Sequence, residues 1–277
     1  MSEKKVKRLG ISNYFFTKEE FSAKHLQIAS NAGFNFIEFW GVMPHYNCHD
    51  FSRTATTKKQ LREHKVKVHS IHTTSGLPYD GANISIFAFE ECQRKAAVEE
   101  IKKNICTLAL LDGEIAVIHP GGAAEPDERV RRLQKSKDSI KELLDYSVSM
   151  GIKIAIENTL VDNAICLQAE ELRAYVDSFH SDEIGICFDT SHANLTQDIF
   201  TAEKICGDKI IHLHISDNYG QKDNHFVPYE GQIDWLQFRD ILKDVGYSGV
   251  YMFEIRPNPD EAGTLKKVSD VYDKLFA

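Results

Sequence analysis

The feature that most constrains the fold is a repeating pattern in which short apolar runs alternate with longer segments of helical spacing. The eight runs have the length and composition of buried strands, and they cover residues 6–11, 34–39, 66–72, 115–119, 153–157, 184–189, 210–214 and 249–254. Amphipathic segments lie between them at 19–32, 57–64, 91–111, 126–150, 169–179, 202–206, 235–245 and 262–276, and the segment at 57–64 is short and weak. No linker rich in Pro, Gly or Ser interrupts the alternation. The pattern predicts an α/β fold, a (β/α)8 TIM barrel formed as a single domain over residues 1–277.

Composition and charge exclude several classes of protein. The chain has 33 Lys and Arg against 41 Asp and Glu, a formal net charge of −8, and 42% hydrophobic residues. These values are typical of a globular protein, and the negative charge disfavours nucleic acid as a partner because such binding depends on neutralising phosphates. No run approaches the roughly 18 apolar residues of a membrane span, and the first residues lack a signal-peptide core.

Cysteine usage points to the compartment. The six cysteines are widely spread and form no C-x-x-C pair, which predicts free thiols in a reducing cytoplasm rather than disulfides or a zinc ribbon. We therefore expect a cytoplasmic protein with no membrane partner. The sequence leaves homo-oligomerisation open.

Six consecutive predicted strands end in a residue type that binds metals. Their last residues are His72, His119, Glu157, Asp189, His214 and Glu254. Active sites of such barrels lie at the C-terminal ends of the strands, and side chains alternate between the two faces of a strand. Counting back by twos from these ends predicts that smaller residues, with Val68 and Ile210 among them, line the barrel. The bulky apolar residues between them then face the helices.

The six ends are expected to meet at one rim, where uncompensated carboxylates would cost several kcal/mol through repulsion and desolvation. A divalent cation removes that cost, and mixed His and carboxylate ligands suit Zn²⁺ or Mn²⁺. Loops after the sixth and seventh strands add His192, Asp223 and His225. Each residue alone also has a structural interpretation, as a helix cap, a hydrogen-bonded core histidine or one half of a salt bridge.

A set of motifs carries a resemblance to a known superfamily. The motifs are I-H-P-G-G (118–122), I-E-N-T (156–159), F-D-T-S-H-A (188–193), H-L-H-I-S-D-N (212–218), D-N-H-F-V-P-Y-E-G-Q-I-D-W (223–235) and F-E-I (253–255). In this order and spacing they resemble the xylose isomerase-like barrel superfamily. That superfamily includes sugar phosphate isomerases and epimerases as well as the endonuclease IV phosphoesterases. The chain departs from the usual motif at Tyr229, where a glycine is common.

The resemblance implies between one and three divalent ions, Zn²⁺ or Mn²⁺. By analogy with keto-sugar epimerases, a first ion is held by Glu157, Asp189, His214 and Glu254. By analogy with endonuclease IV, His72, His119 and Glu157 hold a second ion, and His192, Asp223 and His225 hold a third. The resemblance also implies that Glu157 and Glu254 are the catalytic residues and exchange protons from opposite faces of the substrate.

Two features favour the sugar branch. Residues 37–46 (I-E-F-W-G-V-M-P-H-Y) contain no Arg, unlike the basic, aromatic DNA-penetrating loop of endonuclease IV, and the chain is acidic. We expect Trp40 and His45 to form a wall of a sugar pocket, although a packed Trp and a surface His explain them equally. His212 and Arg256 are further candidates for substrate binding, and Arg256 would hold a phosphate or carboxylate unless it forms a structural salt bridge.

The sequence therefore predicts a metal-dependent isomerase or epimerase acting on a sugar, a sugar phosphate or a keto-polyol. Proton transfer would proceed through a metal-stabilised enediolate. The small-molecule partner is a carbohydrate, and no nucleic acid is expected. The alternative is an endonuclease IV-like zinc phosphoesterase acting on abasic DNA. A barrel that binds ligands without catalysis is a third class.

Overall fold

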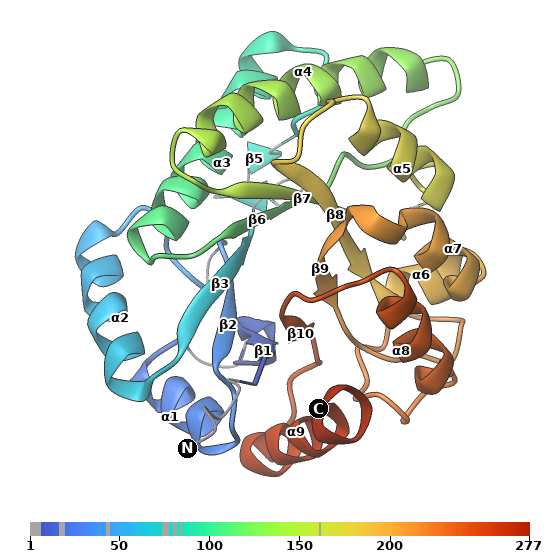
Figure 1. Cartoon of the computed structure of the whole chain (residues 1–277). Coiled ribbons are helices and arrows are strands. Elements are labelled where there is room, and N and C mark those ends of the chain that lie inside the picture. Colours follow the sequence, from blue (N-terminus) through green and yellow to red (C-terminus); the bar gives the residue numbers. More distant parts are fainter. Residues whose placement is uncertain are drawn as a thin grey trace.

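The structure is a computed structural model that describes residues 7–16, 20–42, 45–73, 78–79, 82–83, 85–160 and 162–277. Eight parallel strands form one nearly closed sheet in the order β10-β1-β2-β3-β6-β7-β8-β9 (Figure 1). Their bounds are Leu9–Ser12 (β1), Phe36–Trp40 (β2), Lys67–His72 (β3), Ile115–Ile118 (β6), Lys153–Glu157 (β7), Ile184–Asp189 (β8), Ile210–His214 (β9) and Tyr251–Phe253 (β10). A parallel bridge between Ile215 and Phe253 joins the two ends of the sheet. The predicted (β/α)8 barrel is confirmed.

Helices surround the strands on the outside of the barrel (Figure 1). They are η1 (Asn13–Phe16), α1 (Ala23–Asn31), α2 (Phe51–His64), α3 (Glu91–Leu110), α4 (Arg129–Val148), α5 (Ala169–Asp177), α6 (Thr190–Thr196), α7 (Ile199–Cys206), η2 (Gly207–Lys209), α8 (Trp235–Asp244) and α9 (Glu261–Phe276). A two-stranded hairpin, β4 (Pro78–Tyr79) with β5 (Ala82–Asn83), lies between β3 and α3. Within the described residues, no helix combines the length and apolar character that crossing a bilayer requires.

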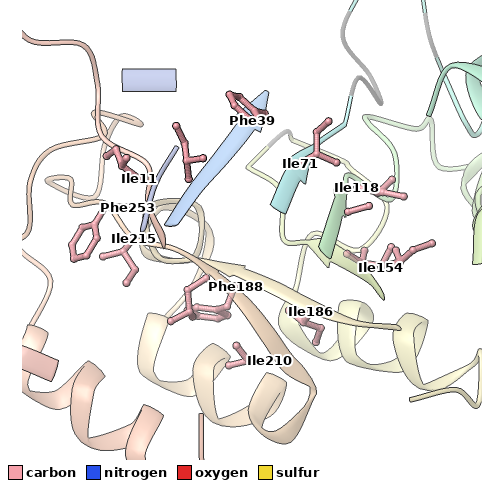
Figure 2. Packing of buried hydrophobic residues seen from close by; sticks show 14 of the residues in the cluster. Ile11, Phe39, Ile71, Ile118, Ile154, Ile186, Phe188, Ile210, Ile215 and Phe253 are labelled. Carbon is pink, nitrogen blue, oxygen red and sulfur yellow. The ribbon is translucent and has the colours of Figure 1, made fainter. Parts of the chain in front are cut away.

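The main apolar core lies between the sheet and the helices. Figure 2 shows Ile71, Ile118 and Ile154 with other strand residues of this layer, and all three are fully buried. A second, smaller cluster of Ile115, Val117, Ala155 and Cys187 fills the barrel interior. The bulky set thus faces the helices and the small set faces inward, as strand alternation predicts.

Two predicted inward residues are corrected by the structure. Val68 and Ile210 belong to the outer core, and Ile211 packs against the inner cluster instead of Ile210. The register shifts between Ile37 and Glu38 on β2 opposite β3, and between Ile186 and Cys187 on β8 opposite β9. An extra residue in one strand reverses the face of every residue before it, so counting back by twos fails there.

Two helical segments also differ from the prediction. Helix α2 begins at Phe51 rather than at residue 57, because the Asp50 side chain accepts a hydrogen bond from the backbone N–H of Arg53 and caps the helix. Residues 190–196, predicted as a loop, form α6. All six cysteines are free thiols, as expected.

Candidate metal centre and active site

The six predicted strand ends meet at the C-terminal rim of the barrel, beneath a cavity of about 310 Å³. Its walls come from several βα connections rather than from one segment. The lining residues are Trp40, His72, Ser85, Ile86, Phe87, His119, Gly121, Gly122, Glu157, His192, Asp223, His225 and Glu254. The rim of the barrel therefore carries a partly open cavity with a polar floor.

Four buried side chains form the centre of this floor: Glu157, Asp189, His214 and Glu254. One ligand atom from each lies within 4.8 Å of those of the other three. The Nδ1 atom of His214 is the common neighbour, at 2.9 Å from Oε1 of Glu157, 3.5 Å from Oε2 of Glu254 and 3.8 Å from Oδ2 of Asp189. Three carboxylates and one imidazole thus face a single point.

A second group shares Glu157. The Nε2 atoms of His72 and His119 lie 3.0 Å and 2.9 Å from Oε2 of Glu157, on the side of this carboxylate that faces away from His214. The three residues also satisfy the distance requirement of a metal site. Glu157 is therefore placed between two potential ion positions.

The third group, His192, Asp223 and His225, lies at the edge of the cavity. Oδ2 of Asp223 is 2.9 Å from Nε2 of His225 and 3.6 Å from Nε2 of His192, and Ser191 Oγ donates a hydrogen bond to Oδ1 of Asp223. Helix α6 positions His192, because Oδ1 of its N-cap residue Asp189 accepts a hydrogen bond from the backbone N–H of His192. All nine residues expected to bind metal thus lie in one cluster.

The donor set fits a divalent ion. Oδ2 of Asp189 is buried, yet it accepts no hydrogen bond from the described residues, and its nearest imidazole nitrogen, Nδ1 of His214, lies 3.8 Å away. A buried carboxylate oxygen without a hydrogen bond is costly, and a cation at the shared point would compensate it. The oxygen and imidazole ligands, without a thiolate among the four central residues, suit Mn²⁺, Zn²⁺ or a similar ion.

When no ion is bound, protonated imidazoles supply the positive charge that stabilises the buried carboxylates. Burial alone would raise the pKa of Glu157, but His214, His119 and His72 hold it well below its usual range. Burial raises the pKa of Asp189 to about 6. Burial would lower the pKa of His192, yet Asp189 and Asp223 raise it to about 10. Ion binding must therefore displace protons from imidazoles.

Trp40 contacts the candidate catalytic carboxylate directly. Its indole Nε1–H donates a hydrogen bond of 2.9 Å to Oε1 of Glu254, which leaves Oε2 on the side of His214. Tyr14 stacks on Trp40 with ring centroids 4.9 Å apart and also lies beside His225 at 5.1 Å. Of the two residues expected to form a wall, Trp40 lines the cavity, and its indole also holds one oxygen of Glu254.

Three residues expected to bind substrate lie elsewhere. His45 is half-buried behind Trp40, with ring centroids 5.3 Å apart, and does not line the cavity. The Arg256 guanidinium is exposed and lies over the ring of Phe226 at 4.3 Å. His212 is completely buried inside the barrel. The cavity as described leaves these three side chains outside its walls.

Residues 26–272 match the family described as "Xylose isomerase-like TIM barrel", which is most of the chain. The chain belongs to this family.

The sequence identity to individual relatives is modest. An uncharacterised protein of Methanocaldococcus jannaschii is 28% identical, with 98% of this chain and 92% of that protein covered. The D-psicose 3-epimerase of Agrobacterium fabrum is 24% identical over 87% of this chain and 82% of its own length. Among solved structures, a D-tagatose 3-epimerase-like protein superposes with a TM-score of 0.81 and 26% identity, and 96% and 97% of the two chains are covered.

The sequence analysis missed Glu38. This carboxylate is fully buried in β2 of the family barrel and contacts both histidines of β9. A charged residue within the apolar run F-I-E-F-W was the signal, since an unpaired charge is rarely buried in a strand. Ser85, Ile86 and Phe87, which line the same cavity as the candidate metal ligands, were also missed.

Asp217 organises the connection that carries Asp223 and His225. Its carboxylate accepts hydrogen bonds from the Trp235 indole and from four backbone N–H groups, those of residues 218, 229, 231 and 233. A Cβ at Gly231 would lie 2.3 Å from Oδ1 of Asp217, so only glycine fits there. Tyr229 has a φ of +75°, which explains why glycine is common at this position of the family motif.

Proposed function

We propose that this protein is a divalent-metal-dependent sugar epimerase or isomerase. The observation that carries the proposal is the central group, in which Glu157 and Glu254 approach one point together with Asp189 and His214 at the floor of the cavity. Two of the relatives named above, a D-psicose 3-epimerase and a D-tagatose 3-epimerase-like protein, support a carbohydrate substrate. A cavity of about 310 Å³ lies at the small end of ligand sites and suits a monosaccharide.

In this proposal Glu157, Asp189, His214 and Glu254 hold the ion. When bound, a divalent ion supplies electrophilic stabilisation to an oxygen that gains negative charge as a carbon-bound proton is removed. The chain itself supplies the proton acceptor and the donor. Glu157 ends β7 and Glu254 directly follows β10, and two strands lie between these elements around the rim, so the two carboxylates can approach a carbon atom from different sides.

The surroundings of the two carboxylates differ in a way that suits these roles. Both oxygens of Glu157 lie within 3.0 Å of imidazoles, whereas Glu254 has one oxygen fixed by Trp40 and the other directed to the centre. A base must keep one oxygen available to the proton it removes. Glu254 comes nearer to this requirement, because Trp40 holds only its Oε1 and Oε2 has no donor within 3.0 Å among the described residues, whereas Glu157 requires its imidazoles to shift toward an ion.

The lining also bears on the substrate. Among the described residues that line the cavity there is no Lys or Arg, and Arg256, the candidate for a phosphate, lies outside it. Ile86 and Phe87 add apolar surface to the lining. These features favour a sugar without a phosphate group.

The nine-residue cluster keeps a second candidate open, a zinc phosphoesterase of the endonuclease IV type. The groups around Glu157 and around Asp223 have the residue types that such an enzyme uses for its further ions. The net charge of −8 disfavours it, because binding to duplex DNA requires many contacts between cations and phosphates.

The test measures both activities on one preparation. We expect the protein loaded with Mn²⁺, Co²⁺ or Zn²⁺ to exchange a carbon-bound proton of D-psicose, D-tagatose or D-fructose with D₂O, followed by ¹H NMR. Glu157→Gln and Glu254→Gln should each abolish exchange, because the amide keeps the shape of the side chain but has no basicity. Glu203→Gln, a buried carboxyl of α7 away from the cavity, is the matched control. Salt-sensitive incision of abasic duplex DNA without sugar exchange would instead support the phosphoesterase.

A further inference from the structure

A buried polar group lies inside the barrel, directly below the candidate metal centre. It consists of Glu38 on β2, Ser70 on β3, and His212 and His214 on β9, all fully buried. Nothing in the proposed reaction requires Glu38 or His212, and neither lines the cavity. A buried carboxylate is retained only where its contacts compensate the loss of water.

The contacts of Glu38 reach across the barrel. Its carboxylate lies 2.9 Å from Nε2 of His212, and Nε2 of His214 lies 3.0 Å from one oxygen and 3.1 Å from the other. Ser70 Oγ donates a further hydrogen bond of 2.8 Å to the same carboxylate. β2 and β9 are not neighbours in the sheet, so these contacts cross the interior of the barrel.

The geometry of His214 is decided by this arrangement. Its Nε2 faces Glu38, and its Nδ1 faces Glu157, Glu254 and Asp189 on the opposite side of the ring. A carboxylate accepts but does not donate, so Nε2 must carry a hydrogen when it contacts Glu38. Nδ1 is then the only ring nitrogen of His214 that has a lone pair available to an ion.

We propose that Glu38 is a positioning residue that holds the His214 ring with Nε2–H toward the barrel interior and thereby assigns Nδ1 as the metal-binding atom. The inference rests on the proposed metal dependence. Hydrogen bonds from a ligating histidine to a carboxylate commonly fix the ring and strengthen metal binding by ten- to a hundredfold.

Glutamine at position 38 would disturb this arrangement while keeping its shape. Its single carbonyl oxygen can accept from one imidazole, and its NH₂ group then faces the other. Either His214 loses its acceptor or the His212 ring must turn. Glu38→Gln should therefore weaken Zn²⁺ binding about ten- to a hundredfold, measured by competition with a chromophoric chelator. Glu203→Gln makes the same change in a buried carboxyl away from the cavity, and it should leave Zn²⁺ affinity unchanged.

A second measurement needs no change at Glu38 and holds even if Glu38→Gln does not fold. Long-range ¹H–¹⁵N spectra of the Zn²⁺-loaded, histidine-labelled protein report which nitrogen carries the hydrogen. We expect His214, assigned by the loss of its signal in His214→Gln, to show a protonated Nε2 and a metal-bound Nδ1. A folded Glu38→Gln protein should lose the strongly hydrogen-bonded Nε2–H signal, which a merely space-filling Glu38 would not affect.

The outcomes separate the two proposals. Zn²⁺ bound through Nε2 of His214, or full affinity in folded Glu38→Gln, overturns the role of Glu38 and leaves the metal centre intact. Failure of the unmodified protein to bind Zn²⁺, Mn²⁺ or Co²⁺ overturns both the metal centre and the inference.

Discussion

Replacing Trp40 with Phe tests whether the aromatic wall acts through Glu254. The substitution keeps an aromatic ring but removes the Nε1–H that donates a hydrogen bond of 2.9 Å to Oε1 of Glu254. A hydrogen bond to a charged acceptor contributes about 1.5–3 kcal/mol. If this contribution holds Glu254 in the orientation from which it takes and returns the proton, its loss lowers kcat about ten- to 150-fold, because about 1.4 kcal/mol corresponds to a factor of ten. KM should change little, since the indole N–H faces the carboxylate rather than the cavity.

The assay is the rate of carbon-bound proton exchange on D-psicose in D₂O, with kcat and KM measured separately on metal-loaded protein. Tyr247→Phe is a suitable control, because it also removes one aromatic hydrogen-bond donor, which contacts the Val250 carbonyl away from the active-site cavity. This control should lose stability but retain kcat. A folded Trp40→Phe protein with kcat within about threefold of the parent would refute the reasoning.

Three further predictions concern strain, burial and metal uptake. Tyr229→Gly should raise the free energy of unfolding by about 1 kcal/mol in urea titrations, since glycine adopts the φ of +75° without strain; unchanged or lower stability would contradict this. Burial raises the pKa of Glu203 to about 9, so the wild-type fold loses stability as pH rises from about 4.5 to 9. Glu203→Gln should be more stable than the parent at pH 7, by up to about 3 kcal/mol, and show no advantage below about pH 4; thermal melts at several pH values measure this. Asp223 and Glu254 raise the pKa of His225 to about 9 against the effect of burial, so any ion that uses His225 must displace its proton. The affinity for that ion should therefore rise about tenfold for each unit by which the pH increases, up to about pH 9. His225→Ala should then lower the measured metal stoichiometry, whereas unaltered stoichiometry and kinetics would assign this residue to the loop alone.

The fold was predictable because strand periodicity is a local property. Eight apolar runs and the helices between them are legible along the chain, and a parallel barrel directs all strand ends to one rim. This is why His72, His119 and Glu157, which are far apart in sequence, could be placed together before any coordinates were known. Their roles as ligands and catalysts remain predictions.

Local pattern failed where the backbone departs from regular alternation. The two register shifts, opposite β3 and opposite β9, exchange the faces of Val68 and Ile210, and no residue type in those strands marks an inserted position. Strand alternation would place Arg256 on the same inward face as Glu254. However, β10 ends at Phe253, and the Arg256 side chain instead leaves the barrel and lies over the ring of Phe226. Parity carries no information beyond the last hydrogen-bonded residue of a strand.

The sequence by itself determined the barrel, its C-terminal rim and the chemical types gathered there. Only the tertiary structure decided that Nδ1 of His214 faces Glu157 while Nε2 faces Glu38. It also decided that Trp40 binds Glu254 and that Glu38 contacts His212 as well as His214. These contacts link strands that are not adjacent, so they depend on the width and closure of the barrel. Periodicity places a residue on a face, but it does not measure the distance across the interior.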